Sequence, residues 1–469
     1  MSAQRGPIGI VSAVFAAIAL YGGVSVVGEE ITQETNTTLY SLQSQAKPGG
    51  FSKIDVLLEI RGDLKIRGDN KVEKLPMQAK GTLGYKERLL HLGDDALTGL
   101  RSLRHYEKAE VDIQVHGDRS HRALPEESRL IAVNRKLENT ELYCVEEPLT
   151  RDDLDLIEIP CNSLLVEGLL PGYDLPIGST WPHSDHLLAA LLSIDAVSSN
   201  DVQSKFVSVE KNMAKIEMAG TVEGAVAGVA TEMDIKARYL FDTLQGRIVW
   251  MAMIIKERRS IGHVAPGLDA VARLQMTVRP LKSAPELSDE VIARLPTVDE
   301  ETRDLLVFES NEHGFAFVYP RSWYIVNEDE NLVVMRMIER GDLIAQCNIS
   351  PLGRKPASHA TTLDTLQRDI KSSLGQNFGS FTRASEGTTS SGLTIHEVVA
   401  QGTASSQPMQ WRYYVVGDES GNRLTFAFTL ESSLVPRLGE IDRQIVTSVQ
   451  FIAPARQRAA QSAEKATRR

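Results

Sequence analysis

The sequence predicts an α+β protein. It would hold an N-terminal, mainly antiparallel β domain with a packed helix, then a C-terminal α/β sandwich of an antiparallel sheet and two amphipathic helices. Two observations lead to this prediction. Apolar and polar residues alternate with period two along many short stretches, as in Lys53–Arg61, which is typical of half-buried strands. The last third of the chain adds two stretches of helical periodicity to such strands.

The first residues of the chain are predicted to form an export segment. Arg5 precedes an uncharged run from Pro7 to Gly28, and Glu29 and Glu30 follow it. The run fits a secretory signal, but it is also long enough to cross a bilayer, so residues 1–28 are either a cleaved signal peptide or an N-terminal anchor. Residues 29–50 are polar and are expected to form a disordered tether. The protein is therefore predicted to be periplasmic or extracellular, with the apolar segment as a means of holding it to the membrane.

Residues 51–282 are predicted to form the β-rich domain. The turns are expected at Gly62-Asp63, Gly68-Asp69-Asn70, Gly117-Asp118 and Gly246, since these residues tolerate the positive φ that tight hairpins require. The alternating stretches predict strands near residues 53–61, 71–80, 83–91, 106–116, 203–209, 213–220, 232–240, 247–256 and 270–279.

One predicted strand is apolar on both faces. Residues 248–255 read Ile-Val-Trp-Met-Ala-Met-Ile-Ile, which implies cover on both sides. A helix near Ser184–Ile194 offers one cover, because four leucines form a stripe on it. These apolar faces leave open a second function, a periplasmic carrier of a lipid or another small hydrophobic ligand.

Residues 283–304 are predicted to be an acidic interdomain linker. The segment holds seven acidic residues against two arginines, Pro285 and Pro296 interrupt it, and a short helix is expected near 290–295.

Residues 305–453 show a pattern of their own. Strands are expected near 314–319, 331–338, 342–350, 393–400, 409–417 and 423–430. The first helix would follow Thr361 or Thr362 as its cap, and the second would follow Ser433 with Pro436 in its first turn. Helices on one sheet make an α+β sandwich.

A family resemblance arises from this last third. The stretch Gly314-Phe-Ala-Phe-Val-Tyr-Pro320, followed by Trp323, an internal helix, a run of four strands and a closing helix, resembles the PsbP-like fold over about 150 residues. The resemblance implies a small, mostly non-enzymatic binding or assembly module, and Trp323 is expected to fill the core. The first half resembles periplasmic lipid-carrier half-barrels such as LolA in strand pattern and compartment.

The charge balance excludes one class of partner. The net charge of −11 does not favour the clustered lysines and arginines that bind a phosphate backbone, so no nucleic-acid partner is expected. Residues 454–469 are predicted to be a basic disordered tail, which serves either solubility or attraction to an anionic surface.

Three cysteines bear on the compartment. Cys144 and Cys161 are 17 positions apart, so one disulfide between them with Cys347 as a buried thiol is the economical arrangement. Three buried, free thiols are the alternative.

Two groups of residues are candidates for binding. The first group lies at the start of a predicted helix and consists of two imidazoles and a carboxylate, from His183, Asp185 and His186. These side chains either bind a metal ion, or the segment serves only as the cap of the helix. The second group is a basic stretch that leads into a Gly and Pro turn, and it either binds an anionic ligand or is a solvated strand end. Its residues are Lys256, Arg258, Arg259 and His263.

The motifs of common enzyme classes are absent from the sequence. It contains no nucleophile elbow, phosphate-binding loop, dinucleotide fingerprint or His-Glu-x-x-His helix. We therefore expect an exported envelope protein that binds an envelope protein or a ligand without catalysis and needs no cofactor. A metal-dependent hydrolase that uses His183 and His186 is the third hypothesis.

Overall fold

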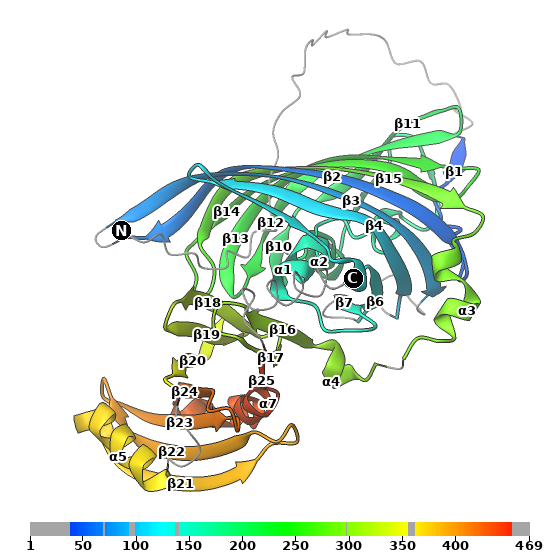
Figure 1. Cartoon of the computed structure of the whole chain (residues 1–469). Coiled ribbons are helices and arrows are strands. Elements are labelled where there is room, and N and C mark those ends of the chain that lie inside the picture. Colours follow the sequence, from blue (N-terminus) through cyan, green and yellow to red (C-terminus); the bar gives the residue numbers. More distant parts are fainter. Residues whose placement is uncertain are drawn as a thin grey trace.

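The computed structural model describes residues 38–68, 71–92, 99–136, 140–296, 298–354 and 362–452. Figure 1 shows a large, strongly curved sheet wrapped around short helices, with a smaller sheet beyond one end of it. The fold is a β-rich α+β fold with antiparallel sheets and few helices, as the sequence predicts.

The large sheet has 13 strands in the order β7-β6-β4-β3-β2-β15-β14-β13-β12-β11-β9, with β5 paired to β4 and β10 to β12. Its two halves meet where β2 pairs with β15 along their whole length. The strands are β2 (Phe51–Arg67), β3 (Val72–His91), β4 (Arg101–Val115), β5 (Asp118–Ala123), β6 (Leu130–Arg135), β7 (Thr140–Cys144), β9 (Thr180–Pro182), β10 (Ala196–Asn200), β11 (Gln203–Glu210), β12 (Met213–Val226), β13 (Val229–Asp242), β14 (Arg247–Arg259) and β15 (Gly267–Leu281).

The predicted alternation sets the faces of this sheet. In β2 the alternate apolar residues of Lys53–Arg61 point to the concave side and are at most 5% exposed: Ile54, Val56, Leu58 and Ile60. The turn expected at Gly62-Asp63 is wrong, because β2 continues through it. A Cβ atom on Gly62 would lie 2.4 Å from that of Ala270 on β15, so close approach of a neighbouring strand explains this glycine. The turns at Gly117 and Gly246 are confirmed, and both glycines have positive φ.

Helices fill the concave side of the large sheet (Figure 1). They are α1 (Arg151–Ile157), the 3-10 turn η2 (Val166–Leu169) and α2 (Asp185–Leu192). Ser184 caps α2, and the four leucines of its stripe are at most 3% exposed. The concave face of β14 is buried against these helices, whereas its convex face is only partly covered. The prediction that both faces of this strand are covered is therefore correct for the concave face only. Trp250 and Ile254 lie on that convex face.

Part of the predicted tether is ordered. The short strand β1 (Leu39–Ser41) pairs with β8 (Asp174–Pro176), and Leu42 is fully buried. The tether prediction is therefore wrong for these residues, because Leu42 finds a place in the core. Residues 1–37 and 453–469, which include the predicted signal or anchor and the basic tail, lie outside the described residues. Within the described part of the chain, no helix is both long and apolar enough to span a membrane.

The acidic segment 283–304 follows the surface of the large sheet. It forms the 3-10 turn η3 (Pro285–Leu287), α3 (Asp289–Ile292) and α4 (Glu300–Arg303). Leu287 is fully buried, and Glu286 and Asp289 form ion pairs with Lys86 and Arg88 of β3. The acidic residues thus attach this segment to basic residues of the first sheet.

The C-terminal part contains two smaller antiparallel sheets. One has the order β16-β17-β25 and the other β18-β19-β20-β24-β23-β22-β21. The strands are β16 (Leu305–Ser310), β17 (Phe315–Pro320), β18 (Trp323–Asp329), β19 (Leu332–Glu339), β20 (Asp342–Leu352), β21 (Phe378–Thr388), β22 (Thr394–Ala404), β23 (Gln407–Gly417), β24 (Arg423–Glu431) and β25 (Gln450–Phe451). Trp323 is fully buried with its ring edge-on to Phe428, so its predicted role in the core is confirmed.

The first predicted helix is α5 (Leu363–Leu374), with Thr362 as its cap. The second is divided in two, α6 (Val435–Leu438) and α7 (Ile441–Thr447). It is interrupted at Gly439, which has a φ of +58°, and Ser433 does not cap it.

The large sheet and the C-terminal part are in direct contact. The backbone N–H of Val307 on β16 donates to Leu149 O before α1 (2.9 Å), and one cluster of buried apolar side chains extends from the concave face into β16–β18. This contact creates a cleft between the two parts of the chain.

Candidate functional site

A cleft of about 450 Å³ lies where α1, the β12–β13 turn and the strands β16–β18 meet. Among the described residues, the charged groups that line it are predominantly acidic. Two arginines, Arg151 and Arg259, face six carboxylates: Asp152, Asp155, Glu158, Asp195, Glu309 and Glu328. The rings of Phe308, Tyr319 and Tyr324 contribute to its walls.

Helix α1 presents the central charges of the cleft. Thr150 and Asp153 form a reciprocal capping box at its start, which fixes the register of the helix. Arg151, Asp155 and Glu158 follow at spacings of four and three, so they share one face, while Leu154 and Ile157 enter the core. The helix therefore holds one cation and two carboxylates toward the C-terminal part.

Asp155 has an unusual environment. It forms no hydrogen bond or ion pair with the described residues, and protein surrounds it except where it meets the cleft. Burial disfavours its charged form and raises its pKa to about 7, although the more distant positive charge of Arg151 acts against this. Near neutral pH, Asp155 is thus divided between its neutral and charged forms.

Two neighbouring acids have raised pKa values for the same reason. Burial raises the pKa of Glu158, and the positive charge of Arg321 partly offsets this rise. Burial also raises the pKa of Asp195, which the positive charge of Arg259 partly offsets. Asp195 also accepts a hydrogen bond from the backbone N–H of Gly228 (2.9 Å), which ties the β12–β13 turn to the cleft wall.

Arg151 joins the two parts of the protein. Its guanidinium donates to the backbone oxygens of Arg321 (2.5 Å) and Trp323 (3.2 Å) and lies over the ring of Tyr324. No ion pair joins the guanidinium of Arg151 to Asp155, so Arg151 acts on that carboxylate only through the longer-range attraction that works against its raised pKa.

The structure separates the four basic-cluster residues. Lys256 and Arg258 are exposed on the convex face of β14, where Arg258 pairs with Glu232. Arg259 points to the opposite face, because side chains alternate along a strand, and it lines the cleft near Glu257 (3.4 Å). His263 lies in the following loop, where its carbonyl accepts from Arg336 (2.6 Å). Only Arg259 thus belongs to the cleft.

His183, Asp185 and His186 also point in different directions. His183 is 7% exposed, and its Nε2 is 2.7 Å from the hydroxyl of Ser204, which in turn meets Tyr239 (2.9 Å). Burial lowers the pKa of His183 to about 4. Asp185 accepts from Asn200 (2.6 Å), and His186 is exposed. The described residues contain no group of three or more His, Cys, Asp or Glu side chains able to hold a metal ion.

The predicted disulfide is not formed. Cys144, Cys161 and Cys347 are all free and buried, which matches the alternative of three small core residues. Cys144 points toward the backbone oxygen of Glu127, while Cys161 contacts Met253 of β14 (3.5 Å). These two environments lie apart, so the spacing in the sequence is not matched by proximity in the fold.

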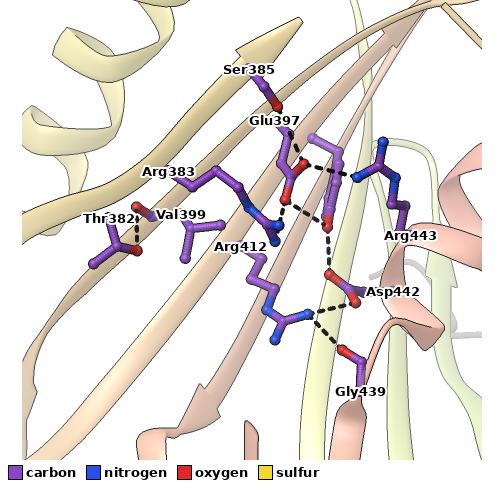
Figure 2. Close-up of polar contacts among 10 residues, drawn as sticks. Thr382, Arg383, Ser385, Glu397, Val399, Arg412, Gly439, Asp442 and Arg443 are labelled. Atoms are coloured by element: carbon purple, nitrogen blue, oxygen red, sulfur yellow. Dashed lines mark hydrogen bonds and ion pairs between the residues drawn. The ribbon is translucent and has the colours of Figure 1, made fainter. Parts of the chain in front are cut away.

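Two further polar clusters serve the fold. Inside the large sheet, Arg104 donates to Glu87 (2.7 Å) and Ser163 (3.0 Å), which fastens the segment after α1 to β3 and β4. Figure 2 shows the second cluster, in the C-terminal sheet, where Glu397 lies between Arg383 and Arg443, and Asp442 faces Arg412. Asp442 is fully buried and Glu397 is 4% exposed, so the site offers a ligand little access.

One pocket inside the large sheet is small. The pocket between β3, β4 and the segment after α1 has a volume of about 20 Å³, enough for about one water molecule. The leucine stripe of α2 and the apolar face of β14 thus form a filled core.

The cleft could not have been identified from the sequence. The spacing of Arg151, Asp155 and Glu158 on one helical face was the available signal. The opposite wall, β16–β18, lies about 150 residues further along the chain, and nothing in the sequence links the two.

Neither a protein-family model nor a curated protein matches the chain. Among solved structures, the chain is similar to cyanobacterial PsbP (CyanoP) from Synechocystis sp. PCC 6803, with 15% identity over 32% of this chain and 92% of that one, at a TM-score of 0.27. It is also similar to the Ran-binding protein Mog1p of Saccharomyces cerevisiae (8% identity, 31% and 95% coverage, TM-score 0.26). The similarity to PsbP is one of fold alone, over about a third of the chain.

Proposed function

We propose that this protein is an exported, non-catalytic binding protein of the cell envelope, and that its cleft binds a small organic cation. The observation that carries this proposal is Asp155, which has no hydrogen-bond or ion-pair partner among the described residues and lies in a cleft whose lining holds three times as many carboxylates as arginines. An ammonium group would give Asp155 its missing partner and lower the pKa of that carboxyl. The ring of Tyr319 also lines the cleft, and an aromatic face attracts the same charge.

The two alternative functions receive less support. A carrier of lipid or another hydrophobic ligand needs an apolar cavity, whereas the leucine stripe of α2 and the apolar face of β14 pack into one buried cluster. A hydrolase that uses His183 and His186 needs both imidazoles at one metal, and His183 is buried against Ser204 while His186 is exposed.

The proposal can be tested by calorimetry on the full chain. The probes are cadaverine, a diamine, and glutarate, a dianion of similar length. We expect cadaverine to bind and glutarate not to bind. Because Asp155 is mostly protonated at pH 6, affinity for cadaverine should rise about tenfold between pH 6 and pH 8.

Two variants locate the binding. Asp155→Asn should weaken cadaverine binding about tenfold and abolish most of its pH dependence. Asp269→Asn, at a half-exposed acid on β15 that pairs with Lys74, should leave both unchanged. Binding of glutarate as tight as that of cadaverine, or equal effects of the two variants, would rule out the cation site.

A further inference from the structure

The end of the large sheet opposite the cleft carries an apolar rim. Eight large apolar side chains stand exposed in the described part of the chain, and only Leu57 and Val72 lie elsewhere. The other six form the rim, with exposed fractions from 37% to 73%: Leu39, Leu90, Leu92, Tyr173, Ile177 and Leu244.

The strand register places these residues at one end. Leu90 and Leu92 lie where β3 ends, and Leu244 lies in the turn where β13 ends and β14 begins. The pairings of β3 with β2, β2 with β15, β15 with β14 and β14 with β13 put those strand ends on the same side. The chain before β2 crosses this end, since Gln45 N donates to Gly246 O and Gly49 N to Leu89 O.

The strand pair β1 and β8 completes the rim. Leu39 is paired with Pro176, which brings it beside Ile177, and Gly178 N donates to Phe206 O in the middle of β11. In Figure 1, β1 and β11 are labelled together at one end of the sheet, away from β18 and the C-terminal sheets. Lysines 47, 211 and 282 are exposed at the same end, beside Asp174 and Glu210.

A single isolated apolar residue on a surface is ordinary, but a concentration of six at one end of a sheet is typical of an interaction site. The position of β1 indicates the partner. Only ten residues separate Leu39 from Gly28, the end of the uncharged run that is long enough to enter a bilayer. Ten residues span at most about 35 Å, so a membrane that holds this run lies within reach of the rim.

We propose that the apolar rim docks on the surface of a lipid bilayer. Leu39, Ile177 and Leu244 would enter the boundary between headgroups and acyl chains, and the lysines would lie at headgroup level, as amphipathic side chains do. In this orientation the cleft and the C-terminal sheets face away from the membrane. The proposal does not depend on the ligand of the cleft, and its test uses no cleft ligand.

The test places a fluorophore on the rim of the full-length protein. Leu244→Cys and the control Leu57→Cys, an exposed leucine in mid-strand on β2, are each labelled with an environment-sensitive dye. The native cysteines are at most 6% exposed and do not compete for it. Each protein is mixed with vesicles of phosphatidylcholine and phosphatidylglycerol that carry doxyl-labelled lipid.

We expect the dye at position 244 to shift to the blue and to be quenched about threefold more than the dye at position 57. An N-terminal anchor alone would retain the protein on the vesicles while leaving both dyes in water, so equal quenching overturns the proposal. Absence of vesicle binding overturns it as well. A second experiment places the dye on Leu90→Cys. In this labelled protein, the triple change Leu39→Ser, Ile177→Ser and Leu244→Ser should abolish the quenching, whereas the single change Leu57→Ser should preserve it.

Discussion

Gly228 and Gly341 lie back to back: a Cβ atom on Gly228 would stand 2.0 Å from the Cα atom of Gly341. Each glycine is the second residue of a tight turn with two consecutive positive φ angles, after Ala227 in the β12–β13 hairpin and after Arg340 in the β19–β20 hairpin. One hairpin belongs to the large sheet and the other to the C-terminal sheet. Their backbones meet beside the cleft, because Gly228 also donates to Asp195.

Gly228→Ala should therefore loosen the contact between the two parts of the protein. An alanine at positive φ costs about 1 kcal/mol, and the methyl group must also push the two hairpins apart. We expect a loss of about 2–3 kcal/mol in the free energy of unfolding, measured with denaturant, and faster proteolysis in the segment 283–304. Gly117→Ala is the matched control, since Gly117 occupies the same kind of turn at a φ of +99° with nothing within 4 Å of the added atom. Equal losses in the two variants would contradict the contact.

Asp155→Asn should stabilise the protein at high pH. The pKa of Asp155 in the folded state is about 7, above its ordinary value of 3.8, so the folded state holds a proton that the unfolded state has released between these values. The cost of ionising Asp155 is absent below about pH 4, grows as the pH rises toward 7, and is constant above it. Asparagine removes this cost, which is at most about 4 kcal/mol and smaller to the extent that the cleft admits water.

The measurement for Asp155→Asn is the melting temperature of both proteins from pH 4 to pH 8. The difference should be near zero at pH 4 and largest at pH 8. Asp152→Asn is the control on the same helix: Asp152 pairs with Arg122 and is 44% exposed, so its loss should not stabilise the protein at any pH. A stabilisation by Asp155→Asn that is the same at pH 4 and pH 8 would show that burial of the charge is not its cause.

The strands could be predicted from the sequence because period-two alternation is a local property, as the agreement of Lys53–Arg61 with β2 shows. The role of a glycine, by contrast, depends on residues that are distant in the sequence. Gly62 has the composition of a turn, but it lies within a strand because Ala270 of a distant strand approaches it. The cleft was beyond prediction for the same reason: α1 and β16 belong to different parts of the chain, and only the folded protein shows that Val307 bonds to Leu149. Lys256 and Arg259 likewise form one cluster in sequence but lie on opposite faces of β14.

Asp442→Asn should destabilise the C-terminal sheet. Asp442 accepts from Arg412 (2.8 Å) and from the hydroxyl of Tyr414 (2.6 Å), and its side chain is fully buried. The neutral amide would leave the buried charge of Arg412 without its counter-ion, which costs about 3–5 kcal/mol in comparable cases. Arg443→Ala, on the same helix, removes an exposed group 3.8 Å from Glu397 and should cost less than about 1 kcal/mol. Denaturant unfolding followed by the fluorescence of the tryptophans would measure both losses, and a similar loss in both variants would contradict the role of Asp442.

The three cysteines give a direct test of their environment. All three are free and between 0% and 6% exposed, and burial raises the pKa of Cys161 to about 12 and that of Cys347 well above its ordinary value. Because the thiolate is the reactive form, a thiol reagent such as dithionitrobenzoate should label none of them in the folded protein at pH 8. In guanidinium chloride without reductant, three thiols should react per chain, and dithiothreitol should leave the melting temperature unchanged. A single reactive thiol in the unfolded protein would instead mean that Cys144 and Cys161, or another pair, are joined by a disulfide. A disulfide between Cys144 and Cys161 would require the segment from β7 to α2 to follow a different path. In the present path, Cys161 N donates to Leu191 O.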